Sequence, residues 1–376
     1  MKKMLYILNI ANRVNNFSYT SMKAAQELGF DYHIAGNWNY ASEQERAEDE
    51  KKYGIHIYQI DFIRTPYHPG NIKAYKQLKE IVEREKFDVI HCNTPIGGVV
   101  GRLLGKSGKV PTVIYQAHGF HFYKGAPVLN WMIYYPIERW LARYTDALIT
   151  INQEDYQRAQ SFKLRNRGKV YYVPGVGIDV DQYNPGRFDR GRKRTELGLL
   201  DDDIMIISAG DLIARKNYRT SIEAISKTRN SKINYFICGE GPERERLQKL
   251  TSELGMDSYI HFLGFRKDIR ELLWASDIFL FSTLQEGLPR SLSEAMACGL
   301  PCVVSRIRGN TDLIQDDIGG YCCESNNSDE FAERIQFLSS NAELRSKMGK
   351  DNISALRSFS IAKSEEEIER IYKLLV

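Results

Sequence analysis

The chain has 376 residues, more than one hydrophobic core usually supports, and fits two domains of ordinary size. Hydrophobic residues make up 43% and charged residues 27%, which excludes a disordered, collagen-like or small disulfide-stapled chain. No apolar stretch approaches the ~18 to 20 residues of a membrane span, and no signal-peptide core follows the N-terminus, so we expect a cytosolic protein. The six cysteines form no matched C-x-x-C pairs, which favours reduced thiols over a zinc site.

The charge is distributed unevenly along the chain. Residues 1–175 carry 24 Lys and Arg against 16 Asp and Glu, a formal charge of +8, whereas the remainder carries 28 against 32, a charge of −4. A basic first half favours a phosphate-bearing partner, either nucleic acid or lipid head groups. Ordinary scatter of surface charge is the alternative.

Short apolar runs alternate with amphipathic segments along the first half of the chain. Residues 72–85 have helical spacing of apolar side chains, and the runs between such segments have the length of strands. The expected strands are residues 4–9, 32–35, 55–60, 89–92, 112–115, 147–151 and 170–173. This alternation predicts a doubly wound α/β sheet.

The alternation stops at VPGVG, residues 173–177, and resumes after a polar, charge-rich stretch. A second Rossmann-like sheet is expected from strands at residues 204–208, 233–238, 260–262, 278–281 and 302–304. The last segment, 364–376, has helical apolar spacing and is expected to cross back to the first domain. The predicted domains are therefore residues 1–176 plus 364–376, and residues 177–363.

Two Rossmann-like domains that face each other form a cleft at the carboxyl ends of both sheets. The first strand leads into IANRVNN instead of G-x-G-x-x-G, which disfavours a nicotinamide enzyme. In the second domain, Gly287 follows a strand as a turn residue, and Pro289 suits the first turn of a helix whose amides point toward a ligand. Glu286 and Glu294 flank this helix start, where they would contact hydroxyls of one extended polar ligand. The alternative is that the two glutamates share no ligand: one simply lies near the positive end of a helix, and the other is an exposed helical residue.

Glu286 and Glu294 also match an E-x7-E signature, in the block EGLPRSLSEAMACGLP. This block resembles that of family 4 of the retaining glycosyltransferases. Further blocks agree in order and spacing: IHCNTPIGGVVGR, YQAHGFHFYKGAP, YYPIERW, TDALITINQED, VGID, CGEGPE, LGFRKDI and IRGNTDLI. The resemblance spans nearly the whole chain and is to the bacterial branch that builds capsule, exopolysaccharide and lipid-linked oligosaccharides.

The resemblance implies a GT-B fold, with two Rossmann-like domains facing across a cleft and a nucleotide sugar held by the second domain. It implies that Glu286 binds hydroxyls of the donor sugar and that Glu294 binds the ribose. The amides of Gly287 and Leu288 would face the diphosphate, as would the ammonium group of Lys216.

Three further donor-site assignments follow from the resemblance. Many relatives have Arg where this chain has Asp211, and we expect Arg215 to supply that second cation. Arg266 stands where the family contacts the base. His118 stands where the family places a histidine against the donor sugar, with His121 as a helper or core residue. We assign His118, Glu286 and Lys216 catalytic roles of positioning and electrostatic stabilisation.

Acceptor binding has weaker signals in the first domain. Gly97, Gly98 and Arg102 follow a strand and open a helix, which suits either a phosphate or close helix–strand packing. Asn12, in the loop after the first strand, is a further candidate for acceptor binding. Residues 127–144 mix aromatic and basic side chains, a pattern of membrane interfaces that is more common in protein cores.

The predicted function is retaining transfer of a sugar, expected to be an N-acetylamino sugar, from a UDP-sugar to a polyprenyl-diphosphate-linked acceptor. The enzyme would work at the anionic inner face of the cell membrane, with no nucleic-acid partner. Asp179 and Asp181 form a D-x-D sequence, but they lie where turns and caps favour Asp, so no metal and no cofactor are expected. A sugar-nucleotide epimerase and a non-catalytic sugar-nucleotide-binding scaffold are the alternatives.

Overall fold

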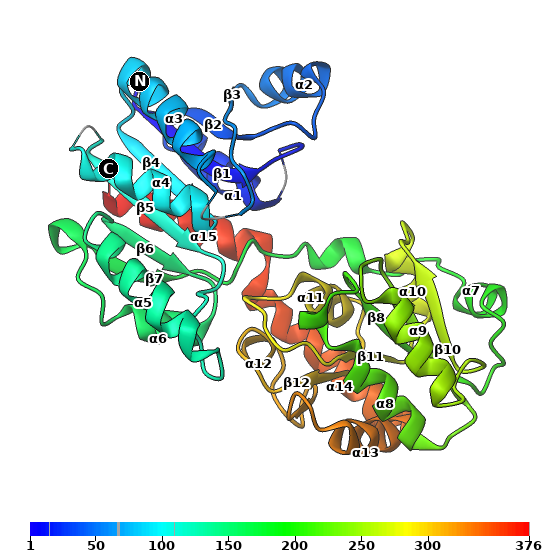
Figure 1. Ribbon diagram of the computed structural model, residues 1–376. Coiled ribbons are helices and arrows are strands. Elements are labelled where there is room, and N and C mark those ends of the chain that lie inside the picture. Colours follow the sequence, from blue (N-terminus) through cyan, green and yellow to red (C-terminus); the bar gives the residue numbers. More distant parts are fainter. Residues whose placement is uncertain (15, 66–67, 109, 376) are drawn as a thin grey trace. The chain divides into compact units, whose positions relative to one another are not determined.

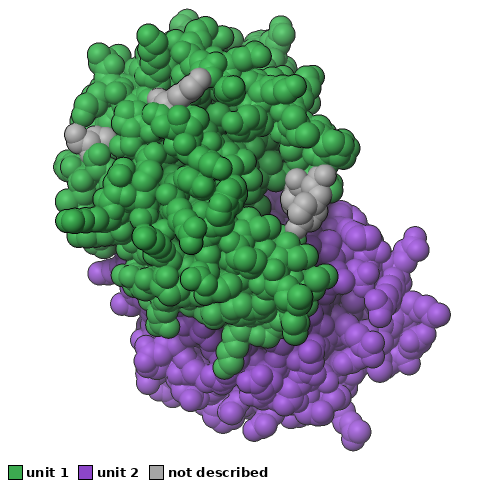
Figure 2. All heavy atoms as spheres, turned by 60° about the vertical axis from the view of Figure 1, so that its left-hand side comes forward, with its two compact units in different colours: residues 1–177, 361–376 green, residues 178–360 purple. Residues whose placement is uncertain are grey.

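The computed structural model (Figure 1) describes residues 1–14, 16–65, 68–108 and 110–375, with the side chains of residues 16 and 17 excepted. The chain forms two compact units, coloured separately in Figure 2. Unit 1 comprises residues 1–177 and 361–376, and unit 2 comprises residues 178–360. The expected boundaries, after residue 176 and before residue 364, differ from these by one and three residues.

Unit 1 is built on a seven-stranded parallel sheet with the order β3-β2-β1-β4-β5-β6-β7. Its strands are β1 Lys3–Ile10, β2 Asp31–Asn37, β3 His56–Gln59, β4 Val89–Asn93, β5 Thr112–Ala117, β6 Ala147–Thr150 and β7 Lys169–Tyr172. Its α-helices are α1 Asn16–Glu27, α2 Glu43–Tyr53, α3 Asn71–Glu85, α4 Pro95–Lys106, α5 Val128–Ala142, α6 Gln153–Ala159 and α15 Ile361–Leu375.

Both faces of this sheet are buried, which explains why its strands are nearly continuous apolar runs. Side chains alternate along β1. Met4 and Tyr6 point to the face where α15 packs, and Leu5 and Ile7 point to the face covered by α3 and α4. Each fully buried large apolar side chain contributes about 1.5–3 kcal/mol to folding. The sheet therefore provides a rigid support for the loops at its carboxyl edge.

Helix α15 (red in Figure 1) is joined to unit 1 by a buried polar cluster, and it packs against α1. The hydroxyl of Tyr372 lies 2.6 Å from Nδ1 of His91 on β4 and also contacts the hydroxyl of Ser21 on α1. An ion pair between Lys23 and Glu365, at 2.6 Å, ties the same two helices near the surface. The C-terminal helix therefore returns to the first domain, as the sequence predicts.

Unit 2 is built on a six-stranded parallel sheet with the order β10-β9-β8-β11-β12-β13. Its strands are β8 Ile204–Ala209, β9 Ile233–Cys238, β10 Ile260–Gly264, β11 Ile278–Phe281, β12 Cys302–Ser305 and β13 Gly320–Cys323. Its α-helices are α7 Arg190–Glu196, α8 Tyr218–Thr228, α9 Arg244–Glu253, α10 Ile269–Ala275, α11 Arg290–Ala297, α12 Asn310–Leu313, α13 Ser328–Ser339 and α14 Ala342–Ala355.

Every expected strand is present in the structure. One further strand, β13, was not predicted from the sequence. Strand β13 has the sequence GYCC and pairs with β12 along its whole length. It is short, begins with a glycine and carries two cysteines instead of branched apolar residues, so it lacks the usual sequence signal of a strand. Among the described residues, none of the helices is both long enough and apolar enough to cross a lipid bilayer.

The cluster that holds α15 gives a first prediction. Tyr372→Phe removes a hydroxyl from the buried side chains of His91 and Ser21, which then lose a hydrogen-bond partner. We expect a loss of about 1–3 kcal/mol in the free energy of unfolding. Urea unfolding measures this loss, and Tyr40→Phe, the same change at an exposed tyrosine of unit 1, is the matched control. Equal stability of the two variants would contradict the anchoring role of Tyr372.

Candidate active site

The carboxyl ends of three neighbouring strands of unit 2 gather several residues that the sequence singles out. Strands β8, β11 and β12 lie side by side and run parallel. The loops that follow them contain residues 210–217, 282–289 and 306–309. Because parallel strands end at one edge of a sheet, these three loops are placed to hold a common ligand.

The side chain of Glu286 connects two of these loops through ion pairs. Its Oε1 atom lies 2.8 Å from Nζ of Lys216 and 3.0 Å from a guanidinium nitrogen of Arg215, both in the loop after β8. The hydroxyl of Thr283 donates a hydrogen bond of 2.9 Å to the same oxygen. The Glu286 side chain is only 10% exposed, whereas that of Arg215 is 40% exposed, so the contact with Lys216 is the better shielded of the two ion pairs. The three contacts together fix the carboxylate in one position.

This arrangement leaves an excess of positive charge at the sheet edge. Lys216 and Arg215 are two cations on one carboxylate, and the Lys216 side chain is 12% exposed. Arg308, buried after β12, donates from Nε to the backbone oxygen of Glu286 at 3.1 Å. Fixed cations in a partly dry site attract an anion more strongly than the same charges in water. The edge is therefore suited to a diphosphate.

The backbone around this edge is closely packed. A Cβ atom on Gly239 would lie 2.0 Å from the carbonyl oxygen of Gly210, so glycine is required where the loops after β9 and β8 meet. At Gly309, with a φ of +79°, a Cβ atom would lie 2.6 Å from the carbonyl oxygen of Gly287. The loop after β12 thus packs directly against the backbone that leads into α11.

Helix α11 begins directly after the loop that carries Gly287 and Leu288. Pro289 is its N-cap residue with extended backbone angles, one position before the first helical turn that the sequence predicts for it. The unpaired amides of a helix start favour negative charge. The orientation of α11 is therefore compatible with the anion site expected there, and the roles of Gly287 and Leu288 stay predictions.

Glu294 lies inside α11 and has its own partners. Its Oε1 atom accepts a hydrogen bond of 2.9 Å from Nε of Arg290 one turn earlier. Tyr183 also lies next to Glu294, and burial, followed by the charge of Glu294, raises the pKa of Tyr183 to about 12. Arg290 and Tyr183 hold the Glu294 carboxylate in place, and its expected contact with the ribose stays a prediction.

Arg266 follows β10, two strands away from β8 in the sheet. Its guanidinium forms two hydrogen bonds, of 2.7 and 2.6 Å, with the carboxylate of Asp268. The Asp268 pKa is held well below its usual range, mainly by Arg266 and then by Lys193, whose Nζ lies 2.9 Å away. Arg266 is thus rigidly oriented at the same edge of the sheet, and its contact with a base stays a prediction.

In unit 1, His118 follows β5 at the carboxyl edge of the sheet. Its Nε2 lies 3.1 Å from Oδ1 of Asn93, the last residue of β4. Burial lowers the pKa of His118 to about 4, so the imidazole is neutral at pH 7. A neutral, oriented imidazole is suited to a hydrogen bond with a sugar hydroxyl. His121 instead packs against Tyr134, with ring centroids 4.8 Å apart and the rings tilted by 33°.

Of the two interpretations of the Gly97–Arg102 segment, the structure favours packing for Gly98 and Arg102. A Cβ atom on Gly98 would lie 2.3 Å from the ring of Tyr115, so this glycine permits the close approach of α4 to β5. Arg102 is buried, its guanidinium lies 2.6 Å from Glu138 and 3.8 Å from the centroid of the Tyr115 ring. A guanidinium used in this way is not presented to a phosphate, which corrects the expectation for Arg102. For Gly97 the phosphate contact stays a prediction.

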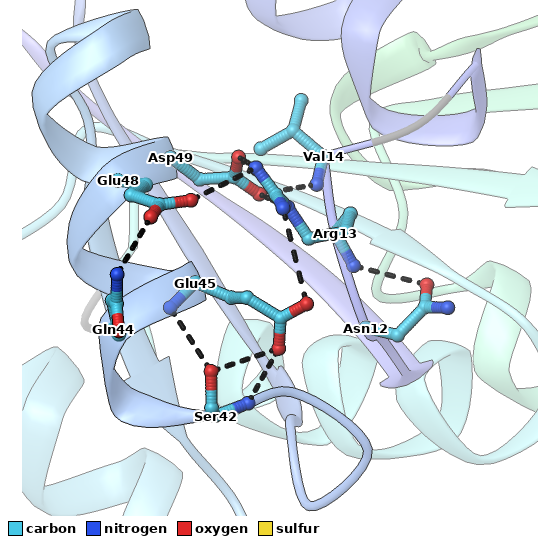
Figure 3. Close-up of polar contacts among 8 residues, drawn as sticks. All are labelled: Asn12, Arg13, Val14, Ser42, Gln44, Glu45, Glu48 and Asp49. Carbon is cyan, nitrogen blue, oxygen red and sulfur yellow. Dashed lines mark hydrogen bonds and ion pairs between the residues drawn. The ribbon is translucent and has the colours of Figure 1, made fainter.

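Asn12 lies in an exposed loop whose next residues are anchored to α2 (Figure 3). Oδ1 of Asn12 accepts a hydrogen bond from the Arg13 amide at 2.9 Å. The Arg13 guanidinium pairs with Asp49 at 2.7 Å, and the Val14 amide donates to the same carboxylate at 2.9 Å. Asp49 is buried although it lies in the acidic run EQERAEDE, and this pattern gave no sign of an anchoring role. Acceptor binding by Asn12 stays a prediction.

Sequence analysis also missed two contacts of Glu286. Arg308 lies within the matched block IRGNTDLI, so a signal for it was present. Thr283 precedes the E-x7-E block and had no signal, because a threonine at the end of a strand is common for packing reasons alone.

Comparisons with known proteins show which family this chain resembles. The family model described as "Glycosyl transferases group 1" matches residues 189–354, and the model described as "Glycosyl transferase 4-like" matches residues 6–152. The chain is 33% identical to the putative glycosyltransferase EpsD of Bacillus subtilis, over 99% of this chain and 96% of that protein. It is 26% identical to the UDP-Gal:alpha-D-GlcNAc-diphosphoundecaprenol alpha-1,3-galactosyltransferase of Escherichia coli, over 84% of this chain and 85% of that protein.

Among solved structures, the chain is similar to Anabaena HepE in complex with UDP. The TM-score is 0.79 at 17% sequence identity, and the match covers the whole of both chains. At this identity the likeness concerns the fold, and it confirms the α/β fold class with two Rossmann-like domains that the sequence predicts.

The ion pair of Arg102 gives a second prediction. Arg102→Met leaves Glu138 without its partner in a mostly buried position, so we expect a loss of about 3–5 kcal/mol in unfolding free energy. The double variant Arg102→Met/Glu138→Met removes both charges and should recover most of that loss. Arg143→Met, at an exposed arginine near the end of α5, is the control. A stable Arg102→Met variant measured by urea unfolding would show that the pair does not hold α4 against α5.

Proposed function

Because this chain belongs to the family 4 glycosyltransferases of the GT-B fold, we propose that it transfers a sugar from a UDP-sugar to a polyprenyl-diphosphate-linked saccharide. The anomeric configuration is retained in the proposed reaction, which serves the assembly of a surface polysaccharide or lipid-linked glycan. The observation that carries the proposal is the contact of Glu286 with both Lys216 and Arg215, next to the start of α11.

The proposed role of Lys216 and Arg215 is to bind the diphosphate and stabilise the charge that develops on it. When the bond between the sugar and the phosphate breaks, negative charge grows on the leaving oxygen. Cations held in advance by the fold stabilise that charge without reorganising. The link to Glu286 fixes both cations, and the amides of Gly287 and Leu288 would add hydrogen bonds to the diphosphate.

We assign the sugar, ribose and base of the donor to separate residues. Glu286 would accept hydrogen bonds from hydroxyls of the sugar, and Glu294 from those of the ribose. Arg266, fixed by Asp268, would contact the base, and the neutral imidazole of His118 would position the sugar. HepE in complex with UDP supports the choice of a uridine nucleotide, and an N-acetylamino sugar remains the proposed donor.

The proposed lipid-linked acceptor is supported by the name of a relative and by an exposed surface on α5. The E. coli relative is named for a diphosphoundecaprenol acceptor. In this chain, α5 exposes apolar side chains spaced along one face, among them Leu129 at 63% and Met132 at 70% exposure. Trp131, Tyr134 and Tyr135 of the same helix pack against the core instead, so these three aromatic residues of the segment 127–144 serve the core.

An exposed apolar face beside basic residues is typical of proteins that rest on anionic membranes. Lys124 precedes α5 and Arg143 follows it, and residues 1–175 carry the charge of +8. We therefore propose that the enzyme binds peripherally to the inner face of the cell membrane, through α5, while it takes its lipid-linked acceptor.

The donor-binding proposal is tested by thermal unfolding with a panel of UDP-sugars, including UDP-GlcNAc, UDP-GalNAc, UDP-Glc and UDP-Gal. A ligand at 100 times its dissociation constant stabilises the folded protein by about 2.7 kcal/mol, so the donor should raise the unfolding midpoint. UDP-sugar hydrolysis, followed in the same samples, separates an enzyme from a non-catalytic scaffold, and the sugar recovered separates transfer from epimerisation.

The third prediction concerns the residues that stabilise charge. Glu286→Gln and Lys216→Ala should each lower turnover by about 10² or more, because Lys216 brings positive charge to the diphosphate and Glu286 fixes Lys216 and Arg215 in place. Lys249→Ala removes an exposed lysine of the same unit and should leave turnover unchanged. Steady-state transfer rates provide the measurement, and near-native turnover of either site variant would remove that residue from the mechanism.

The fourth prediction is that transfer needs no divalent metal ion. Lys216, Arg215 and the amides before α11 supply the positive charge that a metal ion would otherwise bring to the diphosphate. Transfer measured in excess EDTA should therefore continue at the rate found without it. Complete loss of transfer in EDTA, with recovery on addition of Mg²⁺ or Mn²⁺, would contradict this.

The fifth prediction concerns α5. The full chain should sediment with anionic phospholipid vesicles at low salt and dissociate as salt rises, because salt screens exposed charges. The double variant Leu129→Ser/Met132→Ser should bind these vesicles at least about tenfold more weakly, since burying one such side chain contributes about 1.5–3 kcal/mol. Leu200→Ser, at an exposed leucine of unit 2, is the control. Equal sedimentation of all three proteins would show that α5 does not contact the membrane.

A further inference from the structure

Three potential metal ligands meet at the amino ends of β2 and β3 in unit 1. Asp31 is the first residue of β2, His56 is the first residue of β3, and His33 pairs with His56 across the two strands. One ligand atom from each of the three side chains lies within 4.8 Å of the others. Because the strands are parallel, this edge of the sheet is opposite the carboxyl edge that carries His118.

The two histidine–carboxylate distances lie on either side of the ligand spacing in a tetrahedral metal site. Nε2 of His33 lies 3.0 Å from Oδ2 of Asp31, and Nε2 of His56 lies 3.6 Å from Oδ1 of Asp31. In a tetrahedral zinc site with bonds of about 2.0–2.1 Å, neighbouring ligand atoms are about 3.3–3.4 Å apart. The rings of His33 and His56 are stacked, with an interplanar angle of 28°, so His56 has to turn for both nitrogens to face one ion. Its side chain is 59% exposed, which allows this movement and leaves a path for an ion to enter.

His33 provides an independent sign of a ligand. Its ring is buried, and its Nε2 atom makes no hydrogen bond of acceptable geometry, even though Asp31 is near. Its other ring nitrogen, Nδ1, lies 3.1 Å from the hydroxyl of Tyr58 on β3. Metal-binding histidines usually use their second nitrogen in such a hydrogen bond, which turns the lone pair of the first nitrogen toward the metal. Nε2 of His33 thus lies beside the Asp31 carboxylate without a well-formed hydrogen bond to it.

The surrounding charges leave Asp31 available for a cation. Lys3 lies nearby, but its Nζ pairs with Glu85 at 2.9 Å, and Arg84 pairs with the same carboxylate at 2.9 Å.

We propose that Asp31, His33 and His56 bind one divalent transition-metal ion, with zinc as the matching ion and water completing its coordination. Two imidazoles and a carboxylate are ligands that zinc accepts, whereas Mg²⁺ and Ca²⁺ prefer oxygen atoms alone. The ion joins β2 to β3, the four-residue strand at the edge of the sheet, and stabilises that edge. It takes no part in sugar transfer, so the proposal is independent of the proposed function.

The test is zinc binding by the full, purified chain, measured by competition with a chromophoric chelator. The wild type should bind one equivalent of Zn²⁺, and zinc should raise its unfolding midpoint. His56→Gln and Asp31→Asn should each weaken zinc binding by at least about tenfold, the loss that even indirect changes at metal sites cause. His68→Gln, at an exposed histidine of unit 1, is the matched control and should bind zinc as the wild type does.

Co²⁺ in place of zinc identifies the ligands. Nitrogen and oxygen ligands give visible d–d bands without the near-ultraviolet charge-transfer band of a cysteine thiolate. The folding of His33→Gln is checked by circular dichroism, and the folded variant should lose these bands. If His33→Gln does not fold, His56→Gln and Asp31→Asn provide the test. The proposal is overturned if the wild type binds no zinc, if His56→Gln and Asp31→Asn bind it as tightly as the wild type, or if the cobalt spectrum shows thiolate ligation.

Discussion

The carboxylate of Glu286, shared by Lys216 and Arg215, is the interaction on which the candidate site depends. A buried carboxylate without partners would cost several kcal/mol, and two cations without a counter-charge would repel each other. Together the three groups are stable, and they carry a net positive charge. The triad also joins the loop after β8 to the loop after β11, so the position of each cation is set by the sheet rather than by its own flexible side chain.

The fold supports this triad by rigid backbone packing. Gly239 and Gly309 allow neighbouring loops to approach closer than any side chain would permit, and Arg308 holds the backbone of Glu286 from the loop after β12. A site built in this way loses little free energy to reorganisation when charge develops on a bound diphosphate. Close backbone packing beneath cations that Glu286 holds in place thus links the architecture of unit 2 to the chemistry that we propose for it.

The sequence predicted the parts of the structure that follow from local patterns. Strands such as β1 and β9 are apolar runs between polar helices, because both faces of each sheet are buried, and the start of α11 is marked by Gly287 and Pro289. Strand β13 was missed because GYCC has no strand pattern of its own and is defined only by its pairing with β12.

The remaining errors and omissions have a common physical cause. Whether Arg102 contacts a phosphate or a carboxylate depends on Glu138 of α5, which lies 36 residues further along the chain. The burial of Asp49 and the meeting of His33 with His56 likewise depend on pairings between distant segments. For Lys216 and Glu286, 70 residues apart, the resemblance to a family assigned both to the donor site, but their ion pair was not predicted.

The central claim is that this triad serves retaining transfer of a sugar from a UDP-sugar. The most direct measurement is to incubate the enzyme with the UDP-sugar that stabilises it and a GlcNAc-diphosphate-lipid acceptor, and to determine the new linkage by NMR. Since the common UDP-hexoses are α-linked, the account predicts an α-glycosidic product, formed by the wild type and strongly reduced with Glu286→Gln. A β-linked product, or equal product with that variant, would contradict it.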